Sequence, residues 1–141
     1  MQTVTILGST GSIGRQTLEV VRAAPDRFRI YALTAGRNTA LMEEQIREFK
    51  PALAVMMQEE AARELKERVK DLPVRVEARM EGLLAAAAAP TVDKVVTAVS
   101  GRIGLEPTLA ALQAKKDIAL ANKETLVAAG ELVMERAREN G

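Results

Sequence analysis

The sequence predicts an α/β fold with a doubly wound, mainly parallel sheet and helices on both faces. Two observations indicate this class. Along the 141 residues, short apolar runs alternate one by one with segments whose apolar residues recur at the helical period, an order typical of a parallel sheet. Apolar residues make up 48% of the chain, and a chain of this length and apolar content can bury the core of one domain.

The expected strands are runs of apolar residues bounded by turn residues. They are residues 4–7, 28–35, 53–57, 73–77, 94–99 and 118–121. The third run is apolar without interruption, as in a strand that is buried on both faces of a sheet. In the fourth run the apolar residues alternate at Val74 and Val76, and we place this short strand at the sheet edge beyond the third.

The expected helices are residues 12–24, 39–50, 59–69, 80–89, 107–116 and 122–140. Three of them end before a proline, which cannot continue a helix because it lacks the backbone N–H. Asn38 is suited to cap the second helix and Pro107 to begin the fifth. Right-handed crossovers then place the fifth strand beside the first. The carboxyl ends of the first, second, fifth and sixth strands are therefore expected to line one crevice.

Composition excludes several kinds of chemistry and partner. The chain has no Cys and no His, which removes disulfides, thiol nucleophiles, zinc sites and histidine acid–base catalysis. A net charge of +1 and an aromatic content of 2% argue against nucleic-acid binding. No apolar run approaches the ~20 residues of a membrane span, and the first residues already enter a strand without a leader sequence. We therefore expect a cytoplasmic protein that binds neither nucleic acid nor membrane.

The most informative turn follows the first strand, where glycines occur at Gly8, Gly11 and Gly14. Glycines let the backbone lie against a diphosphate, and the helix that begins at Ser12 offers free N–H groups and the positive end of its dipole. The common dinucleotide fingerprint has its second glycine where this chain has Thr10. This turn favours a Rossmann-like nucleotide site. The alternative is an ordinary strand-to-helix turn that needs glycine for its backbone angles.

The second informative turn is Gly36-Arg37-Asn38, at the end of the second strand. Dinucleotide sites that take NAD carry an acidic residue here, which holds the ribose hydroxyls. Arg37 would instead bind a 2′-phosphate through paired hydrogen bonds. The sequence therefore predicts NADP rather than NAD. The alternative is an arginine that is simply solvated at the surface.

Two further turns are candidates for ligand contacts. Asn122, Lys123 and Glu124 follow the sixth strand, where polar groups suit a substrate or a nicotinamide ring. Plain helix capping by Asn122 and Glu124 explains them equally well. The turn that runs from Ser100 to Gly104 could let a cofactor approach, although such a sequence is more often an ordinary turn.

Taken together, these segments closely resemble the 1-deoxy-D-xylulose 5-phosphate reductoisomerase family. The likeness extends in order and spacing over the whole chain. The segments that carry it are Gly8-Ser-Thr-Gly-Ser-Ile-Gly14, Ala35-Gly-Arg-Asn38, Gly104-Leu-Glu-Pro-Thr108 and Ala121-Asn-Lys-Glu124.

The resemblance implies an enzyme that rearranges 1-deoxy-D-xylulose 5-phosphate and reduces the product to 2-C-methyl-D-erythritol 4-phosphate. It implies NADPH and a divalent cation (Mg or Mn), a role in isoprenoid synthesis by the non-mevalonate pathway, and a homodimer. By position, Thr10, Gly11, Ser12 and Ile13 would hold the cofactor phosphates. Gly36, Arg37 and Asn38 would hold the 2′-phosphate end. Asn122 and Glu124 would contact the cofactor, and Lys123 the substrate.

We expect residues 1–141 to form the NADPH-binding domain of this enzyme, with its catalytic, metal-binding and C-terminal domains outside the chain. The family's metal-binding Asp-Ser-Glu run would lie beyond Gly141, so no catalytic or metal-binding residue is assigned here. The chain alone is expected to bind NADPH without turnover. The alternatives are the NADP-binding domain of another oxidoreductase, similar to homoserine dehydrogenase, and a nucleotide-binding module without chemistry.

Overall fold

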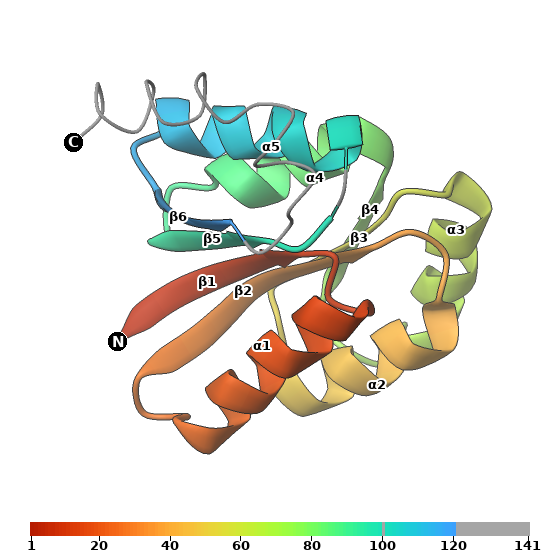
Figure 1. Ribbon diagram of the computed structural model, residues 1–141. Coiled ribbons are helices and arrows are strands. Elements are labelled where there is room, and N and C mark those ends of the chain that lie inside the picture. Colours follow the sequence, from red (N-terminus) through yellow and green to blue (C-terminus); the bar gives the residue numbers. More distant parts are fainter. Residues whose placement is uncertain (100, 121–141) are drawn as a thin grey trace.

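The computed structural model describes residues 1–99 and 101–120, which form a three-layer α/β domain (Figure 1). Every pair of neighbouring strands is parallel. The strands are β1 (Gln2–Leu7), β2 (Phe28–Ala35), β3 (Leu53–Met56), β4 (Arg75–Ala78), β5 (Lys94–Thr97) and β6 (Asp117–Leu120). The helices are α1 (Ser12–Ala23), α2 (Thr39–Phe49), α3 (Glu59–Arg68), α4 (Arg79–Ala88) and α5 (Gly101–Gln113).

The sheet has the strand order β4-β3-β2-β1-β5-β6, which confirms the doubly wound fold. The chain builds β1 to β4 in one direction and then returns to place β5 beside β1. Helices α1, α2 and α3 supply one core, whereas α4 and α5 supply the core on the opposite face. The strand order therefore reverses between β1 and β5, the point at which open α/β sheets bind ligands.

The alternation of side chains in β3 shows how one strand serves both cores. Ala54 and Met56 are buried with α1, α2 and α3, and Leu53 and Val55 are buried with α4. Because successive side chains of a strand point to opposite faces, an unbroken apolar run buries both sides. The edge position of β4 beyond β3 is also as the sequence predicts.

Helix α5 differs from the sequence prediction, because it begins at Gly101 and contains Pro107 in its interior. The prediction treated the two glycines before Pro107 as a turn. The structure uses Gly104 for close packing, because a Cβ atom there would lie 2.3 Å from the carbonyl oxygen of Val99. The Thr108 hydroxyl donates a hydrogen bond to the Gly104 carbonyl (2.6 Å), one turn back along the helix. The expected helix at 122–140 lies outside the described residues.

Helices α2 and α3 are joined at the surface by a network of ion pairs. The Arg47 guanidinium donates to Asp71 at 3.0 Å and to Glu43 at 3.1 Å, and Arg68 donates to Glu43 at 3.3 Å and to Glu64 at 3.2 Å. Hydrogen bonds from Arg47 lower the pKa of Glu43 and of Asp71. The carboxylates are therefore more acidic in the folded chain than in the unfolded chain, so the network stabilises the fold while they are ionised.

This network predicts a pH-dependent effect of Arg47→Met on thermal stability. Because the folded pKa values are lowered, the stabilisation is complete above the ordinary values of 4.5 for Glu and 3.8 for Asp. The stabilisation is lost as the pH falls through the pKa values of the folded chain. At pH 7 the variant should melt below the wild type, and the difference in Tm should shrink toward pH 3.

The control for this prediction is Lys70→Met, which removes one isolated, exposed ion pair with Glu67 and should change Tm little. A difference in Tm that stays constant with pH would assign the effect to packing of the Arg47 stem.

Among the described residues, no helix combines the length and the apolar character that a membrane crossing requires.

Candidate functional site

A cavity of about 340 Å³ opens at the carboxyl ends of β1, β2, β3 and β5, at the reversal of the strand order. It brings together the ends of two turns that the sequence singles out. Gly8, Thr10 and Gly11 come from the turn after β1, and Gly36 comes from the turn after β2. The remaining lining residues are Thr34, Ala35, Met57, Gln58, Leu83, Ala98, Val99 and Ile103.

The turn after β1 is held to the sheet by the end of β2. The backbone N–H groups of Gly8 and Ser9 both donate to the Thr34 carbonyl, at 3.1 Å and 2.8 Å. The Gly8 N–H also lies 3.1 Å from the Thr34 hydroxyl. Gly8 has a φ of +89°, a backbone region that glycine adopts without the steric penalty of a side chain. These contacts fix the start of the turn against the strand that leads to Gly36.

Gly14 allows α1 to approach this turn closely. A Cβ atom at Gly14 would lie 2.1 Å from the Gly8 carbonyl oxygen and 2.6 Å from the Ser9 Cα. Only hydrogen fits at this distance, so Gly14 is required for packing. By contrast, a Cβ atom at Gly11 would meet its nearest neighbour at 3.8 Å, and one at Gly36 would meet nothing within 4 Å.

The amino end of α1 has the character of an anion site. Its N-cap residue, Gly11, has no side chain to accept from the first N–H groups, and the first turn contains no acidic residue. Ser12 and Ile13 stand exposed in this turn. Helix α2 differs, because Asn38 accepts a hydrogen bond from the Leu41 N–H at 3.1 Å, as its predicted capping role requires. The uncapped N–H groups of α1 and its positive dipole end suit a phosphate.

Arg37 is exposed and directly follows Gly36, which lines the cavity, although Arg37 is not itself a lining residue. Within the described part of the chain, its guanidinium has neither an ion pair nor a hydrogen bond. Most other arginines on the face formed by α2 and α3 are neutralised by carboxylates. The unpaired Arg37 after β2 and the uncapped helix end after β1 give this edge of the sheet two separate positive groups for an anionic ligand.

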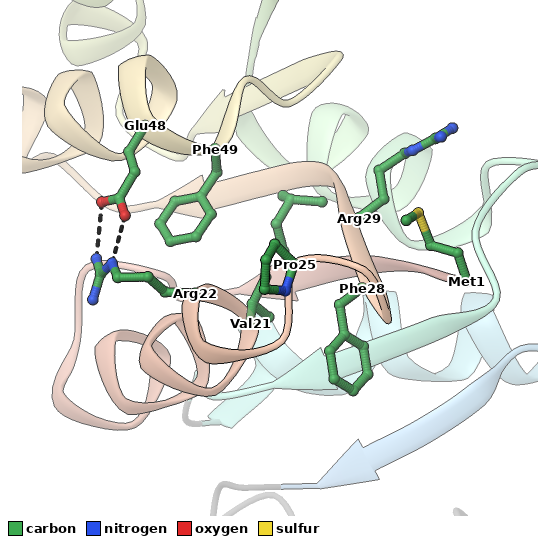
Figure 2. Close-up of a pocket in the computed structure, with 9 residues that line it drawn as sticks. Met1, Val21, Arg22, Pro25, Phe28, Arg29, Glu48 and Phe49 are labelled. Carbon is green, nitrogen blue, oxygen red and sulfur yellow. Dashed lines mark hydrogen bonds and ion pairs between the residues drawn. The ribbon is translucent and has the colours of Figure 1, made fainter.

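A second cavity, also of about 340 Å³, lies at the other end of β2 and is lined mainly by apolar side chains (Figure 2). Two of its charged groups are already paired at one side of the cavity, where the Arg22 guanidinium donates hydrogen bonds to both Glu48 oxygens and lies 5.4 Å from the Phe49 ring centre. The Arg22 hydrogen bond lowers the pKa of Glu48. The residues of this cavity therefore serve the packing between α1 and α2. The cavity at the carboxyl ends of the strands is the better candidate for a ligand site.

Comparison with known proteins identifies the family. The model of 1-deoxy-D-xylulose 5-phosphate reductoisomerase matches residues 4–130. The chain belongs to this family. The reductoisomerase of Desulfitobacterium hafniense is 59% identical over 141 residues, which are all of this chain and 37% of that protein. The chain thus spans just over a third of the length of such relatives. Family membership sets aside the homoserine dehydrogenase-like alternative.

Solved reductoisomerase structures share the fold of this chain. One is described as a complex with NADPH, fosmidomycin and magnesium. It is 40% identical, has a TM-score of 0.93, and is matched over 100% of this chain and 35% of its own. The reductoisomerase of Zymomonas mobilis in complex with NADPH is 38% identical and has the same TM-score, with 99% of this chain and 37% of its own matched.

The remaining candidate residues from the sequence divide into two groups. Asn122, Lys123 and Glu124 lie outside the described residues. Gly104, part of the turn that could let a cofactor approach, is buried in α5 against Val99, whereas Ile103 of the same segment lines the cavity. In residues 1–99 and 101–120, no group of three or more acidic, His or Cys side chains is arranged to hold a metal ion.

Several lining residues were not singled out from the sequence. Met57 and Gln58 follow β3, Ala98 and Val99 follow β5, and Ile103 lies in the first turn of α5. Their types carry no chemical signal. The available signal was positional, because residues that follow the strands next to the reversal of strand order line the ligand crevice.

Proposed function

We propose that this chain is the NADPH-binding domain of an enzyme that converts 1-deoxy-D-xylulose 5-phosphate to 2-C-methyl-D-erythritol 4-phosphate in isoprenoid synthesis. The proposal rests on the uncapped amino end of α1 and the unpaired Arg37, which belong to the two turns whose Gly11 and Gly36 line one cavity. The family supports the same assignment, because solved members are described as NADPH complexes.

The described residues fit the two charged parts of NADPH. The N–H groups of Thr10, Ser12 and Ile13 would donate to the diphosphate. Gly11, whose N–H lies 3.4 Å from the Gly8 carbonyl oxygen, would let the diphosphate approach the backbone. The empty space beside Gly36 would let the adenosine ribose approach the backbone. Arg37 would bind the 2′-phosphate, and Asn38, while its oxygen caps α2, keeps its amide N–H groups for the same end of the cofactor.

Bound NADPH supplies the hydride that reduces the rearranged substrate. From the family resemblance we further propose that Asn122 and Glu124 contact the cofactor and that Lys123 binds the sugar phosphate. We place the divalent cation and the remaining catalytic groups in a part of the enzyme outside residues 1–141, so this domain binds NADPH without turnover on its own. The proposal also includes a cytoplasmic, homodimeric enzyme.

A titration with the two reduced cofactors tests the proposal. NADPH should bind to the protein that contains this chain with a Kd at least about tenfold below that of NADH, because one charge-assisted contact is worth about 1.5–3 kcal/mol. Cofactor fluorescence reports the binding of both. Equal affinity for the two cofactors would contradict the role given to Arg37. Binding of neither would contradict the cofactor assignment itself.

A further inference from the structure

Ser9 in the glycine turn is wholly buried, and a glutamine from α2 satisfies its polar groups. The Ser9 side chain is 0% exposed, and Gln45 is 5% exposed. The Ser9 hydroxyl donates to Gln45 Oε1 at 2.7 Å, and Gln45 Nε2 donates to the Ser9 carbonyl at 2.9 Å. Since a carbonyl can only accept, the amide group of Gln45 has one possible orientation here.

With the bond from its N–H to Thr34 (2.8 Å), Ser9 has its backbone donor, its carbonyl and its hydroxyl bound from the protein interior. Burial of two polar side chains is costly unless they are paired. The cheaper choice at position 45 would be an apolar residue, because its neighbours Met42 and Ile46 lie in the core. The paired amide therefore calls for a role beyond filling space.

The geometry of the peptide bond supplies that role. The chain has no cis peptide in its described part, and in a trans peptide the C=O and the N–H point in opposite directions. Because Gln45 holds the Ser9 carbonyl, the N–H of the same peptide, which belongs to Thr10, is turned away from Gln45. Thr10 lines the cavity, and no hydrogen bond within the described residues occupies its N–H. If this peptide rotated, a carbonyl oxygen would replace the donor and would repel a phosphate.

We propose that Gln45 is a positioning residue that fixes the Ser9–Thr10 peptide so that the Thr10 N–H faces the cofactor diphosphate. This inference rests on the proposed function, in that the ligand is the diphosphate of NADPH. Gln45 itself does not touch the ligand. It acts on binding through Ser9, from a helix whose other contacts serve the core.

The test compares Gln45→Met with Ile46→Val in the full-length protein that contains this chain. Methionine keeps the length of glutamine and loses both hydrogen bonds. Ile46→Val removes one methyl group from the same helix without touching Ser9. We expect Gln45→Met to raise the Kd for NADPH about tenfold, the change that corresponds to about one hydrogen bond, and Ile46→Val to leave it within about twofold.

A second ligand distinguishes a specific effect on the Ser9–Thr10 peptide from a general loss of nucleotide binding. The nucleotide 2′-AMP carries the 2′-phosphate but no diphosphate, so Gln45→Met should leave its Kd within about twofold of wild type. Ser9→Ala removes a single hydroxyl and serves if Gln45→Met fails to fold. Because the hydroxyl orients the Gln45 amide, its loss should weaken NADPH binding in the same selective way but to a smaller extent, since the bond from Gln45 Nε2 to the Ser9 carbonyl can remain. The effects of the two changes should be non-additive.

The outcomes are distinct. Selective loss of NADPH affinity in the variants supports the role of Gln45. An equal loss for NADPH and 2′-AMP, or no loss for either, overturns it while leaving the proposed function standing. A wild-type protein that fails to bind NADPH overturns the proposed function and the positioning role with it.

Discussion

Gly14→Ala is expected to destabilise the domain and to abolish NADPH binding. The new Cβ atom would lie 2.1 Å from the Gly8 carbonyl oxygen, which is backbone and cannot move aside as a flexible side chain could. Overpacking of this kind costs about 1–3 kcal/mol, and occasionally more. The strain falls on the turn that carries the diphosphate donors, so the loss of affinity should accompany the loss of stability. Thermal melting and an NADPH titration measure the two effects.

Gly36→Ala is the matched control for this prediction. It makes the same chemical change at a position where a Cβ atom meets nothing within 4 Å. Its Tm should remain at or slightly above that of the wild type, because alanine reduces the entropy of the unfolded chain. If Gly36→Ala weakens NADPH binding without loss of stability, the open space beside Gly36 is used by the ligand. Equal stability of the Gly14→Ala variant and the wild type would show that the close approach of α1 to the turn is not required.

Arg37→Glu is expected to weaken NADPH binding by about 1.5–3 kcal/mol, the range for hydrogen bonds to charged groups. The binding of NADH should remain nearly unchanged, because NADH lacks the 2′-phosphate. The new carboxylate also repels that phosphate, so the preference between the two cofactors should narrow or reverse. Since Arg37 is exposed, added salt should reduce the difference between wild type and variant.

The control for this change is Arg63→Glu. Arg63 is also exposed, but it lies on α3 and pairs with Glu59, away from the cavity. Arg63→Glu alters the net charge by the same amount as Arg37→Glu and should not change the preference for NADPH over NADH. If Arg37→Glu lowers the affinity for NADPH and NADH equally, Arg37 has a structural role and the 2′-phosphate contact is wrong.

Much of this fold follows from local sequence patterns. The unbroken apolar run of β3 and the alternation in β4 were each sufficient to place a strand in the sheet. The extent of α5 was not predictable in this way. Gly104 disfavours a helix locally and is tolerated because α5 packs directly on the backbone of Val99. The contact between α5 and the backbone after β5 is a tertiary contact, so the spacing of apolar residues along the sequence does not indicate it.

The candidate site shows the same division. The glycine turn and Arg37 were evident because their residue types are unusual at the ends of strands. Gln45 was missed because a polar residue in an amphipathic helix is ordinarily assigned to the solvent side. Its burial depends on Ser9, a residue 36 positions earlier in the chain. A polar pair of this kind becomes visible only when the tertiary structure brings its members together.

The double role of Thr34 has a consequence for how a dinucleotide would be captured. Its carbonyl and hydroxyl accept hydrogen bonds from the first N–H groups of the glycine turn, and β2 ends one residue later at Ala35, directly before Gly36. The end of β2 therefore holds both the glycine turn, which would bind the diphosphate, and Arg37, which would bind the 2′-phosphate. The backbone positions of these two groups are fixed before any ligand binds. Once one end of a dinucleotide has docked, the other meets its partner at a high effective concentration and with little further loss of backbone freedom.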